Sequence, residues 1–171
     1  NKQNSKIKIF FSMFAPKGRQ PSATAIAARN EALRLKALGT CVYFRSEPVP
    51  FDDRENYLLD ADIGVFFQLP NLETSLSART RVYDYIWGGL PVLMTSGDET
   101  AEILRPLQQD LILESYSEEE LTATLLEYAS DKLKQREYKE KITQLRKTLL
   151  WEKQVQPLDA YIRALRDADV R

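Results

Sequence analysis

The sequence predicts an α/β protein with a doubly wound parallel sheet of about five strands, followed by a C-terminal helical tail. Apolar runs of strand length alternate with helical stretches along the chain. Two of the runs, residues 63–67 and 91–94, are continuously apolar, as expected for strands buried on both faces. From Ser130 onward the chain is charged and carries no strand signal. We therefore expect a sheet domain at residues 1–130 and a helical extension at residues 131–171.

The first two strands are expected at residues 6–12 and 41–44, with a basic loop after the first. The helix between them should begin at Ser22, a favoured N-cap residue, and run to about residue 38, where Gly39 stops it. The residues expected on or near its apolar face are Ile26, Leu33 and Leu38.

The middle of the chain is expected to contain two further strands with a helix between them. A short helix at residues 54–59 leads into the strand at 63–67, and a longer helix precedes the strand at 91–94. Ser77 can cap the longer helix, and the glycine pair at 88–89 should end it. Its apolar face should carry Tyr83, Ile86 and Trp87.

The last part of the chain should hold one more strand and several helices. We expect a helix at residues 99–104, a strand at 110–113 and a helix at 117–129 that opens on a serine and three glutamates. The tail is expected to form a helical hairpin with a break near residues 156–157. It should pack on the sheet or on a further domain.

The charge balance argues against nucleic acid and an anionic membrane as partners. Lys and Arg number 24 and Asp and Glu number 25, so the formal net charge is −1 and offers no basic surface for either partner. The sequence contains no histidine, which removes the commonest general base and the usual zinc ligands. We therefore expect no metal.

Two further classes of protein are disfavoured by absent motifs. The chain has neither G-x-x-x-x-G-K-[ST] nor G-x-G-x-x-G, so a nucleoside triphosphatase or a typical dinucleotide-binding fold has no support. No apolar run approaches the ~20 residues needed to span a bilayer, and the first residues have too short an apolar core for a signal peptide. A cytoplasmic location is expected, with the inner face of the membrane as an alternative reached through another domain.

The candidate site residues gather at the carboxyl edge of the predicted sheet, where ligands of open α/β sheets bind. Residues 73–81 reach this edge, and the amino end of the helix together with Arg79 suits phosphate oxygens. Arg81 points to another face. Asp84 can accept two hydrogen bonds from the vicinal hydroxyls of a ribose. Its alternative is an ion pair with Arg81 on the helix surface.

Two other loops supply weaker candidates. Lys17 and Arg19 follow the first strand and are basic, although a solvated loop is the competing interpretation. Asp98, in the string TSGD after the fourth strand, can approach the same pocket. The competing interpretation of Asp98 is a turn and helix cap.

The stretch from Glu73 to Val92 also carries a family resemblance. Glu73, then a helix bearing Asp84, then Gly-Gly-Leu-Pro-Val resembles the donor-site segment of GT-B glycosyltransferases. The closest likeness is to the glycogen-synthase-like retaining superfamily (GT4-like, glycosyl transferases group 1), where E-x7-E precedes G-x-P-V. Here the second acid is Asp84, and the first glutamate is displaced by three residues. The string NLETSLSARTRVYDYIWGGLPV looks like a branch with an S-x-R-T-R-x-x-D-Y element.

The resemblance implies the Rossmann-like, nucleotide-sugar-binding half of a retaining glycosyltransferase that moves a hexosyl group from a nucleoside diphosphate sugar to an acceptor. It implies no cofactor beyond that donor substrate, and Glu73 would bind the hydroxyls of the transferred sugar. A second, N-terminal Rossmann-like domain would hold the acceptor and contact the last helix, and this chain would be inactive without it. The implied catalytic residues are Glu73 and Arg79, and the implied donor-binding residues are Glu73, Ser77, Arg79, Thr80, Arg81, Asp84, Lys17, Arg19 and Asp98.

Two other functions remain open from the sequence. A non-hydrolysing nucleotide-sugar epimerase would have the same fold but would need acid-base carboxylates partly outside this chain. A flavodoxin-like or receiver-like interaction module would have no catalytic role. Receiver domains carry acidic residues after the first and third strands, whereas this chain has Ser-Met-Phe at 12–14 and Gln-Leu-Pro at 68–70, which counts against that module.

Overall fold

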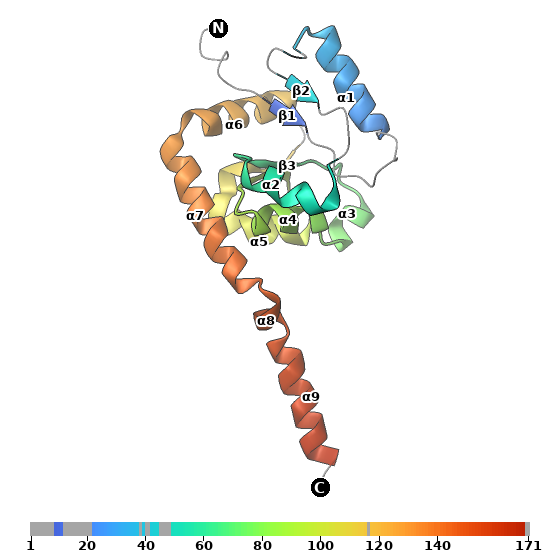
Figure 1. Ribbon diagram of the computed structural model, residues 1–171, viewed down its shortest axis with the longest axis vertical. Helices are drawn as coiled ribbons and strands as arrows, with labels where there is room; N and C mark the ends of the chain where they lie inside the picture. Colours follow the sequence, from blue (N-terminus) through green and yellow to red (C-terminus); the bar gives the residue numbers. More distant parts are fainter. Residues whose placement is uncertain are drawn as a thin grey trace. The chain divides into compact units, whose positions relative to one another are not determined.

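The computed structural model describes residues 9–11, 22–37, 39, 42–44, 49–115 and 117–169. The chain is of the α/β class and divides into two compact units, Asn1–Asp60 and Ala61–Arg171 (Figure 1). The predicted division into a sheet domain at 1–130 and an extension at 131–171 stays a prediction.

The first unit contains a parallel pair of strands and helix α1. Strand β1 (Ile9–Phe11) pairs with β2 (Val42–Phe44), with Ile9 opposite Val42. Helix α1 (Ala23–Arg34) begins as predicted, because the Ser22 hydroxyl accepts a hydrogen bond from the Ala25 amide at 3.1 Å. A 3₁₀ turn η2 (Phe51–Asp53) and helix α2 (Arg54–Leu59) complete the unit.

The predicted end and apolar face of α1 are wrong in part. The helix stops at Arg34, and Lys36 follows with a φ of 54°, a left-handed conformation that cannot continue the helix. Ile26 and Leu33 are about half exposed, at 49% and 50%, whereas the small Ala32 is buried. Leu38 lies outside the described residues.

The second unit is built on a parallel sheet with the order β3-β4-β5. Strand β3 (Gly64–Phe66) pairs with β4 (Val92–Thr95), which pairs with β5 (Ile112–Leu113). The prediction that both apolar runs form strands of a parallel sheet is confirmed, and β4 is buried throughout. β3 is not fully buried, because it is an edge strand of this sheet and Val65 is 41% exposed. A single doubly wound sheet of about five strands stays a prediction.

Two apolar clusters cover opposite faces of β4, since side chains alternate along a strand. Val92 and Met94 pack with helices α4 (Thr80–Trp87) and α5 (Glu99–Gln108). Leu93 packs with α6 (Glu118–Ser130) on the other face. Helix α7 (Lys132–Thr148) adds Ile142 to the first cluster and Tyr138 to the second. The first helix of the predicted extension is thus part of the core.

Three details of these elements differ from the sequence predictions. Trp87 is 48% exposed, because Val82 and Ile86, four residues apart, occupy the buried face of α4. Helix α5 continues past residue 104 to Gln108 with Pro106 inside it, although proline removes a helical hydrogen bond. Strand β5 is shorter than predicted because the 3₁₀ turn η3 (Gln109–Leu111) precedes it.

The glycine pair after α4 ends the helix as predicted. Gly89 has a φ of 71°, its amide donates to the Ile86 carbonyl at 3.0 Å, and the Leu90 amide donates to the Tyr85 carbonyl at 2.9 Å. This pair of bonds is a Schellman motif, which favours glycine at the left-handed position. The turn delivers the chain directly into β4.

We expect the substitution Gly64→Ala to destabilise the second unit by about 1–3 kcal/mol, because it overfills a packed site. A Cβ atom on Gly64 would lie 2.5 Å from two atoms of the Tyr85 ring. That ring is also held by its hydroxyl, which donates to the Val65 carbonyl at 3.3 Å. Urea unfolding followed by circular dichroism measures the cost. A loss below about 0.5 kcal/mol, the usual range of a surface substitution, would show that the ring moves aside freely.

The tail after α7 is helical, with breaks at two places. Helix α8 (Trp151–Gln154) follows a break at residues 149–150, and α9 (Gln156–Asp169) begins directly after Val155, close to the predicted break. Pro157 fits there because the first helical amides have no partner within the helix. In the part of the chain that the structure describes, no helix is long and apolar enough to cross a bilayer.

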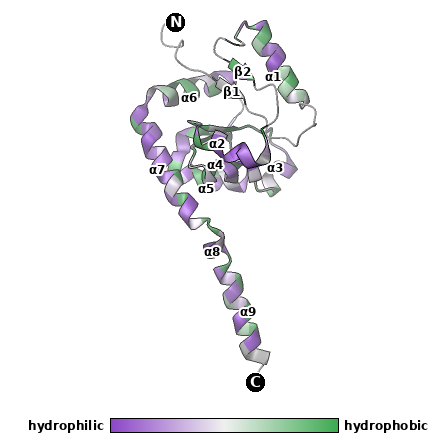
Figure 2. Ribbon diagram, viewed as in Figure 1, coloured by the Kyte–Doolittle hydropathy of each residue, from purple (hydrophilic) through white to green (hydrophobic). Residues whose placement is uncertain are grey.

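Helix α9 does not pack on the sheet. Polar and apolar residues alternate along it (Figure 2), and its side chains at 156–166 are all exposed. The apolar ones are Leu158, Tyr161, Ile162 and Leu165, which are between 46% and 63% exposed. Helix α7 thus packs on the sheet, whereas the alternative, packing on a further domain, stays a prediction for α9.

Candidate functional site

The candidate site lies at the carboxyl ends of β3 and β4. Gln68 follows β3, and its backbone is joined to Thr95, the last residue of β4, by two hydrogen bonds. The Gln68 amide donates to the Thr95 hydroxyl at 3.1 Å, and that hydroxyl donates to the Gln68 carbonyl at 3.0 Å. The loop after β3 is therefore fixed to the edge of the sheet where parallel α/β proteins bind ligands.

A short helix follows this loop, where the sequence predicted an irregular segment. Helix α3 (Leu72–Leu76) is capped by Asn71, whose side-chain oxygen accepts from the Thr74 amide at 2.8 Å. Thr74 is buried, and its hydroxyl donates to the Leu69 carbonyl at 3.1 Å. These bonds tie α3 to the loop that follows β3.

The predicted role of Ser77 as the cap of the following helix is wrong. Ser77 instead ends α3, and its hydroxyl donates to the Glu73 carbonyl. Helix α4 starts at Thr80, with Arg79 in the cap position and no side-chain cap hydrogen bond. The cause is the extra helix α3, which uses Ser77 before the chain reaches α4.

Arg79 is held at this edge with much of its hydrogen-bonding capacity unused. Its side chain is only 11% exposed, its Nε lies 3.5 Å from Asp98 Oδ2, and its guanidinium carbon lies 5.9 Å from the centre of the Phe66 ring. The Nε and Nη2 atoms are buried and have no hydrogen-bond partner among the described residues. A buried cation of this kind normally needs hydrogen-bond acceptors.

Asp98 has a clear structural role at the start of α5. Its Oδ1 accepts from the Ala101 amide at 2.9 Å and from the Thr100 hydroxyl at 2.5 Å, which makes it the N-cap of the helix. Its other oxygen faces Arg79, and the residue is 5% exposed. The structure thus brings together two of the predicted site residues as an ion pair. Whether Asp98 also contacts a ligand stays a prediction.

The other predicted residues of this segment stand on two different helices. Glu73 is exposed in the first turn of α3, and Thr80 is exposed at the start of α4. Arg81 and Asp84 are half-buried on α4 and both act on Tyr85. Burial raises the pKa of Tyr85, the charge of Arg81 lowers it and the charge of Asp84 raises it.

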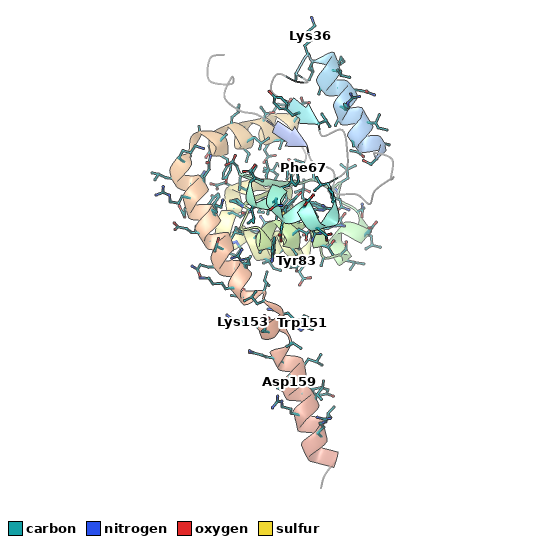
Figure 3. All side chains as sticks on the ribbon, in the orientation of Figure 1. Lys36, Phe67, Tyr83, Trp151, Lys153 and Asp159 are labelled. Atoms are coloured by element: carbon teal, nitrogen blue, oxygen red, sulfur yellow. The ribbon has the colours of Figure 1, made fainter. Side chains whose placement is uncertain are left out.

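Tyr83 lies near the Arg79–Asp98 pair. Burial raises the pKa of Tyr83, and the negative charges of Glu99 and Asp98 raise it further. Tyr83 packs against the cluster under α4 and α5, whereas Phe67 packs against the cluster on the opposite face (both are labelled in Figure 3). Aromatic side chains thus cover both faces of the sheet close to the candidate site.

Lys17 and Arg19 lie outside the described residues. Within the described ranges, no group of acidic or cysteine side chains is arranged to hold a metal ion.

Gln68 is a candidate that the sequence analysis missed. Its side-chain Oε1 is buried and has no hydrogen-bond partner in the part of the chain that is described. The sequence did carry a signal, because Gln68 is the first polar residue after the apolar run at 63–67 and so falls at the carboxyl edge. Counting only partners in the described ranges, the edge therefore offers unused donors on Arg79 and an unused acceptor on Gln68.

Comparisons of the chain with protein-family models, with curated proteins and with solved structures found no match.

Proposed function

We propose that this chain is the nucleotide-sugar-binding half of a retaining GT-B glycosyltransferase. The reaction would move a hexosyl group from a nucleoside diphosphate sugar to an acceptor. The observation that carries the proposal is Arg79, a buried guanidinium at the carboxyl edge of a parallel sheet. Two of its nitrogens have no acceptor among the residues that the structure describes. The motif resemblance from Glu73 to Val92 supplies the ligand class.

The guanidinium favours a phosphate group over a neutral ligand. Arginine stays charged at every relevant pH and presents donors in a fork that matches phosphate oxygens. Asp98 offsets part of the charge, but it contacts Nε only at 3.5 Å and already accepts two hydrogen bonds at the start of α5. Because Nε and Nη2 are buried, covering side chains must shift before a ligand reaches them.

In the proposed reaction Arg79 stabilises the departing diphosphate. The bond between the anomeric carbon and the phosphate oxygen breaks, the bond to the acceptor oxygen forms, and the acceptor proton passes to the departing phosphate. Charge develops on the diphosphate, and donors fixed in a water-poor site stabilise such charge strongly. In this reaction the protein itself would perform this task, with no metal and no cofactor.

We expect Arg79→Gln to weaken the binding of nucleoside diphosphates by about 10- to 100-fold, because a charge-assisted hydrogen bond is lost. Isothermal titration with uridine, guanosine and thymidine diphosphates and their sugars measures the affinity. Arg136→Gln is the matched control, since Arg136 is exposed on α7. Circular dichroism of each variant establishes that it is folded.

Two results would contradict the proposal. The first is a folded protein that binds no nucleoside diphosphate or nucleotide-sugar of the panel at millimolar concentration. The second is an Arg79→Gln variant that binds them as well as the Arg136→Gln control does.

A further inference from the structure

We infer that Gln68 is a ligand-binding residue of this site and that its Oε1 accepts a hydrogen bond from a sugar hydroxyl of the bound nucleotide-sugar. The inference rests on the proposed function, which supplies the ligand class. The observation behind it is the buried Oε1, which has no donor among the residues that the structure describes.

The position of Gln68 is fixed without its side chain. Both backbone groups of Gln68 are bonded to the Thr95 hydroxyl, at 3.1 Å and 3.0 Å, and Thr95 is 7% exposed. The side-chain amide is therefore not needed to hold the loop after β3 on the sheet. The fold does not need the side-chain amide of Gln68, yet the amide is partly buried. Its burial therefore needs another explanation.

Gln108 in the same unit shows what a structural glutamine looks like. It is fully buried, its Oε1 accepts from the Val92 amide at 3.1 Å, and its Nε2 donates to the Val92 carbonyl at 2.6 Å. Both ends of that amide are paired, as is usual for buried polar groups. Gln68 differs because its buried acceptor, at the edge where ligands bind, has no donor within the described part of the chain.

The missing partner must be a hydrogen-bond donor, and this requirement separates the sugar from the phosphates. The diphosphate of a nucleotide-sugar carries only acceptor oxygens at neutral pH, and those oxygens suit Arg79. The ribose and the hexose both carry hydroxyls, which can donate. Gln68 and Arg79 would therefore bind two different parts of one ligand, a sugar hydroxyl and the diphosphate. A simple anion would satisfy Arg79 and leave the Gln68 oxygen unpaired.

The test compares ligands with and without hydroxyls on the whole chain. Heteronuclear NMR titration gives the affinity for sulfate, for the nucleotide of the panel that binds best, for its 2′,3′-dideoxy form and for its sugar derivative. The variant Gln68→Met keeps the shape of the side chain and removes the acceptor. Gln144→Met is the matched control, because Gln144 is exposed on α7.

We expect Gln68→Met to lower the affinity for the hydroxyl-bearing ligand by about tenfold and to change the affinity for sulfate by less than about twofold. If the ribose supplies the donor, the wild-type protein should bind the dideoxy form about tenfold more weakly. If the hexose supplies it, the sugar derivative should bind more tightly than the nucleoside diphosphate. In either case Gln68→Met should lose the preference for the ligand that carries the hydroxyl. Its melting temperature should not fall, since the substitution removes an unpaired buried acceptor.

Two results would overturn the inference while leaving the proposed function in place. One is unchanged binding of the hydroxyl-bearing ligand in Gln68→Met, with or without a lower melting temperature. The other is an equal loss of affinity for sulfate. If Gln68→Met does not fold, Gln68→Asn withdraws the oxygen by one methylene and must give the same ligand pattern. A wild-type chain that binds sulfate but no nucleotide refutes the proposed function itself.

Discussion

Replacing Asp98 by alanine should lower the free energy of unfolding of the second unit by about 3 kcal/mol. Three losses add up in this substitution. The N-cap bond from the Ala101 amide and the bond from the Thr100 hydroxyl disappear, and the Arg79 guanidinium loses the carboxylate nearest to it. Because the Arg79 side chain is only 11% exposed, water cannot fully replace that carboxylate. Urea unfolding followed by circular dichroism measures the change.

Asp131 provides the matched control for Asp98. Asp131 caps α7 in the same way, with its Oδ1 accepting from the Lys134 amide at 2.9 Å, but it is exposed. Asp131→Ala should therefore cost only about 1 kcal/mol, the usual value of a helix cap. Equal costs for the two alanine variants would show that the contact with Arg79 adds nothing. In the double variant Asp98→Ala/Arg79→Gln, part of the excess cost should be recovered, because no buried cation is left unpaired.

The substitution Gln108→Leu should cost about 2–5 kcal/mol, because it leaves two buried backbone groups without partners. Strand β5 pairs only with Met94 and Thr95 of β4, so the Val92 amide and carbonyl have no partner from that strand. The Gln108 side chain replaces the missing strand with bonds of 3.1 Å and 2.6 Å. Leucine fills a similar volume but can neither donate nor accept.

The control for this variant is Gln144→Leu on the exposed side of α7. Surface substitutions of this kind usually change stability by less than about 0.5 kcal/mol. Urea unfolding of both variants at equal m-values gives the comparison. A Gln108→Leu cost as small as that of the control would mean that water or the backbone satisfies Val92 after the substitution.

Local sequence signals predicted much of the second unit. The apolar runs at 63–67 and 91–94 did form strands, and Gly88 and Gly89 did end the helix between them. Ser117 also caps α6 as its sequence context suggested. Each of these features depends on residues close in sequence, so composition and spacing were enough to find it.

The features that were missed depend on particular side-chain contacts, which sequence patterns do not specify. Helix α3 has only five residues, and the bond from the Thr74 hydroxyl to the Leu69 carbonyl helps to hold it in place. The ion pair of Arg79 with Asp98 joins the start of α4 to the start of α5. Sequence patterns placed both residues at one edge of the sheet, but which side chains meet there depends on packing.

The two apolar clusters of the second unit share β4 and α7, so the stability of each cluster depends on the other. Leu93 lies on one face and Val92 and Met94 on the other, while Tyr138 and Ile142 extend the same division along α7. Neither cluster can be lost without removing elements that the other requires, so the unit should unfold as one cooperative body. A ligand bound at the end of β4 would then protect both faces of the sheet at once. The resulting gain in stability is set by its concentration relative to its dissociation constant.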